Sequence, residues 1–266
     1  MEASRRFNVQ QSGNPGGPLL VLAHGFGCDQ NMWRMVRPLL EPTCRVVTFD
    51  YIGAGGSDLS AWDAERYSNL DGYAADVVEL CRKLDLRDAV FVGHSVSATI
   101  GVLAAPVVPE RITRLVLVTP SPCFVDDGDY RGGFSRDDID ELLTSLESNY
   151  LGWSATMAPV IMGNPDRPVL GQELTNSFCR MSPDIARVFA RATFLADNRA
   201  DLDGVTVPTL IVQCAHDAIA PREVGDYVHD HIRGSRLVTL DATGHCPQLS
   251  APDETAAAIL RFVATS

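Results

Sequence analysis

Three residues that lie far apart in the chain have the side-chain types needed for nucleophilic catalysis. Ser95 lies in the string Gly-His-Ser-Val-Ser (residues 93–97), between an apolar run and a predicted helix rich in small residues. A serine hydroxyl is a poor nucleophile at neutral pH, and it needs a base to accept its proton and a carboxylate to orient that base. Asp217 and His245 each follow a predicted strand, in the order acid, then base. We therefore expect Ser95 to be the nucleophile, His245 the base and Asp217 the acid.

Attack on a carbonyl group creates an oxyanion, which needs two N–H donors. Val96 follows the expected nucleophile at the start of its helix, where the helix dipole also favours negative charge. The second donor should come from a loop after an early strand. The loop His-Gly-Phe-Gly (residues 24–27) follows the apolar run 19–23. We expect the backbone N–H groups of Phe26 and Val96 to form the oxyanion hole.

Other ionisable residues near these positions are alternatives that the sequence leaves open. Asp226 and Asp241 could replace Asp217, although Asp241 has the character of a turn residue. His24 and His94 flank the expected site loops. We expect these two histidines to matter through their backbone geometry more than through their imidazoles.

Short apolar runs alternate with helical patterns along most of the chain. Runs that are apolar at nearly every position indicate strands buried on both faces, and hence a parallel sheet covered by helices. Alternating strands and helices predict an α/β fold with a mostly parallel, doubly wound sheet. The predicted strands are residues 18–23, 45–49, 89–92, 115–118, 209–213 and 237–240.

The alternation breaks between about residues 121 and 200, where helical segments follow one another without a strand. This pattern predicts an all-helical lid inserted into the α/β chain. We expect an inserted four-helix lid over residues 122–197, and an α/β core formed by residues 1–121 and 198–266. The predicted lid helices are residues 136–148, 153–162, 168–179 and 182–197, and the predicted core helices are 70–84, 98–105, 221–231 and 253–263.

Composition excludes several classes of function. The chain has 266 residues and a net charge of −12, which argues against a nucleic-acid surface or an anionic membrane as its partner. No apolar stretch reaches the ~18 residues of a transmembrane helix, and the first residues do not have the form of a secretory signal. The seven cysteines include no Cys-x-x-Cys pair, which favours reduced thiols, a cytoplasmic location and no metal site. We expect no cofactor.

The string around Ser95 resembles the nucleophile elbow of the α/β-hydrolases, in which a sharp turn from strand to helix exposes a serine. Ser97 departs from the usual pattern, which has glycine at this position. The resemblance becomes narrower along residues 5–264 and extends to the group that holds the bacterial hydrolase RsbQ and the plant receptors for karrikins and strigolactones. Cys28 and the strings 164–168 and 245–247 look more like the microbial, RsbQ-like members, whereas Ser97 looks more like the plant branch.

This resemblance implies a function and a pocket. Serine at the elbow separates the chain from dehalogenases and epoxide hydrolases, which carry aspartate there. The group implies hydrolysis of a small apolar ester or butenolide-type lactone through an acyl-enzyme. It also implies an alternative, a ligand sensor whose slow hydrolysis serves signalling through a partner protein. The expected lid is two V-shaped helical hairpins over an apolar pocket, with Phe26, Phe134, Trp153, Met157 and Phe194 as its candidate lining residues.

Overall fold

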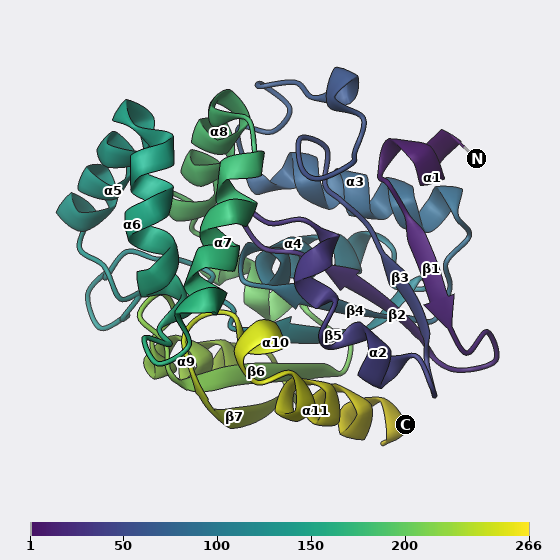
Figure 1. Cartoon of the computed structure of the whole chain (residues 1–266). Coiled ribbons are helices and arrows are strands. Elements are labelled where there is room, and N and C mark those ends of the chain that lie inside the picture. Colours follow the sequence, from purple (N-terminus) through teal and green to yellow (C-terminus); the bar gives the residue numbers. More distant parts are fainter. Residues whose placement is uncertain (1, 266) are drawn as a thin grey trace.

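A twisted sheet of seven strands forms the centre of the molecule (Figure 1), as seen in a computed structural model that describes residues 2–265. The strand order is β1-β3-β2-β4-β5-β6-β7, and every neighbouring pair is parallel except β1 and β3. The predicted α/β fold with a mostly parallel sheet is therefore confirmed. The strands are β1 (Gln10–Gly13), β2 (Leu19–Ala23), β3 (Arg45–Thr48), β4 (Ala89–His94), β5 (Ile112–Val118), β6 (Thr209–His216) and β7 (Arg236–Thr243).

The edge strand β1 is the one strand that the apolar runs do not reveal. Its sequence is Gln-Gln-Ser-Gly, and three of its four residues are exposed. It pairs antiparallel with β3, with Gln10 opposite Thr48. A strand with no buried face carries no hydrophobic period, so its pairing is set by its neighbour rather than by its own pattern.

Helices cover both faces of the sheet. α3 (Leu70–Lys83) and α4 (Val96–Ala104) pack together on one face, and α2 (Arg37–Leu40) and α11 (Pro252–Ala264) pack on the other. The N-cap of α3 is Asn69, whose side chain accepts from the N–H of Asp71. The remaining core elements are α1 (Glu2–Arg6), α9 (Arg222–His231), α10 (Pro247–Ser250) and short 3-10 turns at Gln30–Trp33, Leu59–Ala61, Ala105–Val107 and Arg199–Gly204.

The strand order places a crevice where the site residues lie. From β2 the chain crosses to β3 on one side, and from β4 it crosses to β5 on the other. The carboxyl ends of two neighbouring strands whose connections diverge leave a crevice in which open α/β sheets bind ligands. Here the two strands are β2 and β4. The loop with Phe26 follows β2, and Ser95 follows β4.

Four helices between β5 and β6 form a layer at one end of the sheet, away from both termini (Figure 1). A capping box at Ser135 and Asp138 begins the first, and Gly163 ends the second with a left-handed backbone, which glycine adopts without strain. The predicted lid boundaries at residues 122 and 197 enclose these helices and stay a prediction. They are α5 (Arg136–Ser148), α6 (Tyr150–Met162), α7 (Pro168–Arg180) and α8 (Pro183–Phe194).

The described part of the chain contains no helix that could span a membrane. Among residues 2–265, each helix is either too short or too polar to cross a bilayer. The longest helix, α3, has 14 residues and ends in Arg82 and Lys83.

Gly93 lies near the end of β4 and packs against the first turn of α4, so substitution there should be costly. A Cβ atom at this position would lie 2.2 Å from the carbonyl oxygen of Ser97, which is a backbone atom of α4. We expect Gly93→Ala to lower the free energy of unfolding by about 1–3 kcal/mol, measured by chemical denaturation. Gly204→Ala is the matched control, because a Cβ there meets nothing within 4 Å. Equal stability of the two variants would contradict this packing.

Candidate active site

The turn that carries Ser95 is strained in the way that exposes its side chain. Ser95 has φ 56° and ψ −122°, a left-handed backbone that a residue with a side chain rarely adopts. Its N–H donates to the carbonyl of Val118 on β5, 2.8 Å away. The end of β4 and the first turn of α4 therefore hold the serine at the edge of the sheet, with its hydroxyl aimed at the crevice.

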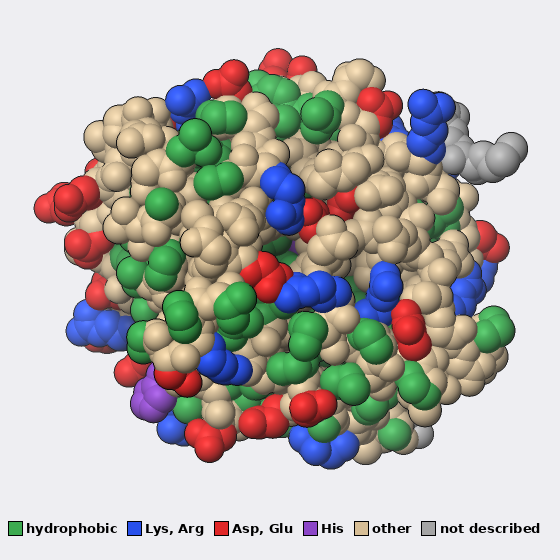
Figure 2. All heavy atoms as spheres, in the orientation of Figure 1, with side chains coloured by type: hydrophobic (Ala, Val, Ile, Leu, Met, Phe, Trp, Pro, Cys, Tyr) green, Lys and Arg blue, Asp and Glu red, His purple; other side chains and the backbone are tan. Residues whose placement is uncertain are grey.

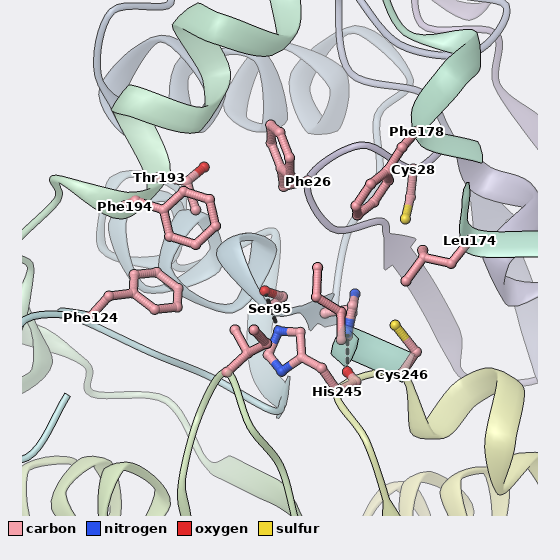
Figure 3. Close-up of a pocket in the computed structure, with 13 residues that line it drawn as sticks. Phe26, Cys28, Ser95, Phe124, Leu174, Phe178, Thr193, Phe194, His245 and Cys246 are labelled. Carbon is pink, nitrogen blue, oxygen red and sulfur yellow. Dashed lines mark hydrogen bonds between the residues drawn. The ribbon is translucent and has the colours of Figure 1, made fainter. Parts of the chain in front are cut away.

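The three residues expected from the sequence meet in one hydrogen-bonded chain. His245 Nε2 lies 2.7 Å from Ser95 Oγ (Figure 3). On the other side of the ring, His245 Nδ1 lies 2.7 Å from Asp217 Oδ2. Asp217 also accepts the N–H groups of Ile219 (2.8 Å) and Ala220 (3.2 Å) at its other oxygen. The carboxylate can thus accept a hydrogen bond from Nδ1–H. This keeps the proton on Nδ1 and leaves the lone pair of Nε2 available to the serine hydroxyl.

The alternative carboxylates lie elsewhere. Asp226 forms a long ion pair with Arg222 (3.8 Å) on α9, and Asp241 is exposed on β7. Neither has a contact with His245 like that of Asp217, whose side chain is fully buried beside the imidazole.

The loop after β2 lies directly against Ser95. A Cβ atom on Gly25 would stand 3.5 Å from Ser95 Cβ and 2.5 Å from His94 Nδ1, so only glycine allows this approach. The backbone N–H groups of Phe26 and Val96 have no hydrogen-bond partner among residues 2–265, which leaves both free to bind an oxyanion. The position of the loop is compatible with the expected oxyanion hole.

The imidazole of His24 holds this loop in place, contrary to the expectation that its backbone geometry matters more than its imidazole. Its Nε2 accepts the N–H of Tyr51 (3.2 Å), so its Nδ1 carries the proton and donates to the carbonyl of Gly25 (3.0 Å). Both ring nitrogens are used, and the ring is fully buried. His24 therefore ties the loop after β2 to the chain after β3.

Ser97, the residue that departs from the usual elbow pattern, has a structural role of its own. Its hydroxyl donates to the carbonyl of His24 and lies 3.0 Å from the hydroxyl of Tyr51. A glycine at this position would make neither contact. Ser97 thus links the elbow to the loop that precedes Phe26.

The imidazole of His94 also has a structural role, because it holds the backbone of the loop that carries His245. Its Nε2–H donates to the carbonyl of His245 (2.7 Å), and Thr119 Oγ1 donates to the same carbonyl (3.2 Å). Burial, together with the neighbouring His245, lowers the pKa of His94 to about 3. His94 is therefore neutral at physiological pH.

A small apolar cavity of about 40 Å³ opens above Ser95 and His245 (Figure 3). Phe26 and Phe194 line it, as the resemblance implied. The remaining lining residues were not identified from the sequence, because they come from loops and helix faces whose orientation a single chain does not reveal. They are Cys28, Phe124, Ile161, Leu174, Phe178, Thr193, Ile219 and Cys246, with His94 below.

Phe134, Trp153 and Met157 lie away from this cavity. They line a more open groove between α5 and α6, so the expectation that they line the pocket at Ser95 is not met. Trp153 stacks on Phe178 at 5.7 Å, which places it one layer behind the cavity wall. The face of α6 that reaches the cavity carries Ile161 instead.

The two cysteines at the cavity are thiols rather than thiolates. Burial raises the pKa of Cys28 to about 12 and holds the pKa of Cys246 well above its usual range. All seven cysteines are free, and six of them are buried. Among residues 2–265 no cluster of three His, Cys, Asp or Glu side chains is arranged to hold a metal ion.

The neutral state of His94 predicts a specific pH dependence of stability. The folded pKa of about 3 lies below the ordinary value of 6.5. Protonation of His94 therefore favours the unfolded chain. The contribution of neutral His94 to the free energy of unfolding is complete above pH 6.5 and falls as the pH drops toward 3. Between pH 7 and pH 5 this loss is about 2 kcal/mol. We expect His94→Gln, which keeps a donor, to lose less stability over this interval than the wild type in urea titrations. Parallel losses in both proteins would contradict a buried neutral His94.

Comparison with known proteins agrees with this architecture. The chain is 40% identical to the karrikin insensitive 2 receptor CA of Petunia hybrida over 257 residues, which cover 96% of this chain and 95% of that protein. It is 39% identical to a probable esterase of Oryza sativa subsp. japonica over 264 residues, 99% of this chain and 97% of that protein. The solved structure of a hydrolase from Oleispira antarctica superposes with a TM-score of 0.96 at 41% identity and covers 100% of this chain and 97% of that one. The model of the alpha/beta hydrolase family matches residues 20–258, and the chain belongs to that family.

Proposed function

We propose that this hydrolase cleaves a small apolar ester or butenolide-type lactone, with Ser95 as nucleophile, His245 as base and Asp217 as orienting acid. The observation that carries the proposal is the hydrogen-bonded chain from Ser95 Oγ through His245 to Asp217, with 2.7 Å at both links. The chain lies at the floor of an apolar cavity, so a bound carbonyl group would meet the serine with little water around it.

In the acylation step, Ser95 Oγ attacks the carbonyl carbon of the ester and gives its proton to His245 Nε2. The carbonyl oxygen becomes an oxyanion, which the N–H groups of Phe26 and Val96 stabilise. The C–O bond of the ester then breaks, and His245 returns the proton to the departing oxygen. With a lactone the ring opens, and the departing oxygen stays attached to the acyl group.

In the deacylation step, His245 removes a proton from water, and the resulting hydroxide attacks the acyl-serine. The second oxyanion collapses, the acid leaves, and Ser95 regains its proton from His245. Asp217 holds the imidazole in the same tautomer during both steps, because Nδ1 points at its carboxylate throughout.

The lining of the cavity favours apolar substrates of modest size. Phenylalanine rings surround the volume above Ser95, and Phe26 lies edge-on to Phe178, Phe189 and Phe194 at 5.5–6.0 Å. The cavity volume of about 40 Å³ lies well below the usual range of small-molecule sites, so a ligand larger than a few atoms requires the lining side chains or the lid to move. The esterase names of relatives support the same class, including a strigolactone esterase of Pisum sativum at 38% identity.

Removal of the nucleophile tests the proposed mechanism. We expect Ser95→Ala to lower kcat for an aryl acetate by roughly 10⁴-fold or more, because no other nucleophile can form the acyl-enzyme. The rate of phenol release is the measurement, and the exposed Ser145→Ala on α5 is the control for the same substitution elsewhere. Retention of the wild-type rate by Ser95→Ala would exclude this mechanism.

A second candidate function is a ligand sensor that acts through a partner protein. The receptor names of relatives support it, and so does the surface of the lid. Hydrophobic side chains occur in several places over the lid helices (Figure 2), and Leu151, Val160 and Val169 are at least half exposed. A partner could cover these residues on α6 and α7 when a ligand fills the cavity.

The sensor function predicts a response to binding without turnover. We expect a butenolide lactone to shift the melting temperature of Ser95→Ala, because binding to the folded state alone changes apparent stability. Differential scanning fluorimetry of that variant measures the shift, and Leu174→Trp, which fills the cavity, is the control. Rapid turnover of the lactone by the wild type, with no shift of the melting temperature of the wild type or of Ser95→Ala, would count against a sensor.

A further inference from the structure

The turn between lid helices α6 and α7 lies against the loop that carries His245. The segment Met-Gly-Asn-Pro-Asp-Arg (residues 162–167) contacts Thr243 at the end of β7 and Gly244 just after it. The two segments come from different parts of the fold, since one belongs to the lid and the other to the sheet. Residues 164–168 take no part in the proposed chemistry, so the proposed function does not explain why this turn contacts the histidine loop.

The lid supplies a hydrogen bond to the histidine itself. The backbone N–H of His245 donates to the carbonyl of Ile161 in the last turn of α6, at 2.9 Å. Carbonyls in the last turn of a helix have no partner within the helix, so this one is available. Two donors from the core, the hydroxyl of Thr119 and the imidazole of His94, bind the carbonyl of His245. The backbone of His245 is thus held from the lid on one side and from the sheet on the other.

Asn164 joins the two segments through its side chain. Its Nδ2 donates to the carbonyl of Met162 in the lid and to the carbonyl of Thr243 in the histidine loop (2.8 Å). Both of its N–H groups are therefore used, and the side chain is buried. A carboxylate of the same shape would place oxygen against two carbonyl oxygens.

Arg167 extends the same contact. Its guanidinium donates to Asn164 Oδ1 and, through Nη1, to the carbonyl of Ser250 at 2.8 Å. Asn164 is oriented by this bond, because the arginine occupies its acceptor and leaves the amide N–H groups to the two carbonyls. Gly244 completes the fit, since a Cβ atom there would lie 1.8 Å from the carbonyl of Met162.

We propose that the α6–α7 turn of the lid is a positioning element for His245, with Asn164 and Arg167 as positioning residues. The proposal rests on the proposed function, in which His245 is the base. The turn fixes the loop from residue 243 to residue 245, so that Nε2 faces Ser95 while Nδ1 faces Asp217. Movement of the lid at this turn changes the alignment of the base directly, without any change in the cavity wall.

Asn164→Asp tests the proposal, with Asn149→Asp as its matched control. Asn149 caps the opposite end of α6 through its side-chain oxygen, a role that aspartate fills equally well, and it is remote from His245. For Asn164→Asp we expect kcat for an aryl acetate to fall roughly ten- to a hundredfold, with KM changed by less than about twofold. The Nδ1–H proton of His245 in the wild type gives a downfield NMR resonance, which should be lost or shifted in Asn164→Asp and kept in Asn149→Asp.

A purely structural role would change stability without changing the histidine resonance or the split between kcat and KM. Wild-type kcat and an unchanged resonance in folded Asn164→Asp would overturn the proposal. If this variant does not fold, Arg167→Ala decides, because Arg167 is exposed and its loss leaves the core intact. We expect Arg167→Ala to lower kcat about three- to tenfold and Arg167→Lys, which keeps a donor for Ser250, to recover part of it. Activity that survives Ser95→Ala would overturn the proposed function instead, whatever Asn164 does.

Discussion

The hydrogen bond between Ser95 Oγ and His245 Nε2 constrains most of the structure, because it joins two loops that are 150 residues apart in the chain. A distance of 2.7 Å requires the ends of β4 and β7 to be placed independently and accurately. Parallel strands bring both loops to one edge of the sheet, and the divergence of the chain at β2 and β4 opens the crevice in which they meet. The strained turn at Ser95 and the buried Asp217 then set the directions of the two side chains.

Buried polar side chains around Ser95, His245 and Asp217 form hydrogen bonds between loops and take no part in the proposed reaction. His24 joins the loops after β2 and β3, Ser97 joins the elbow to the first of them, and His94 joins the elbow to the loop after β7. Removing one partner of such a hydrogen bond would destabilise the fold, because water does not replace the lost partner of a buried polar group. A catalytic site of this kind keeps its alignment because its second layer of residues has few alternative arrangements.

The sequence predicts the parts of the fold that depend on local pattern. Six strands follow from continuous apolar runs, and the main core helices and all four lid helices follow from helical patterns. Ser95, Asp217 and His245 are candidates because of their residue types and their places after strands. Side-chain direction on the lid does not follow, because Trp153 and Ile161 share α6 and only the packing of that helix against α7 decides which reaches the cavity. The imidazole roles of His24 and His94 are equally hidden, since their partners come from distant segments.

Rapid mixing with an aryl ester, followed by acid quench and mass analysis of the intact protein and its peptides, shows whether an acyl-enzyme forms on Ser95. We expect a burst of one phenol per protein molecule and one acyl group on the peptide that contains Ser95, which then disappears as the steady state proceeds. Steady turnover with no acylated protein, or an acyl group on Cys28 or Cys246 instead, would exclude Ser95 as the nucleophile.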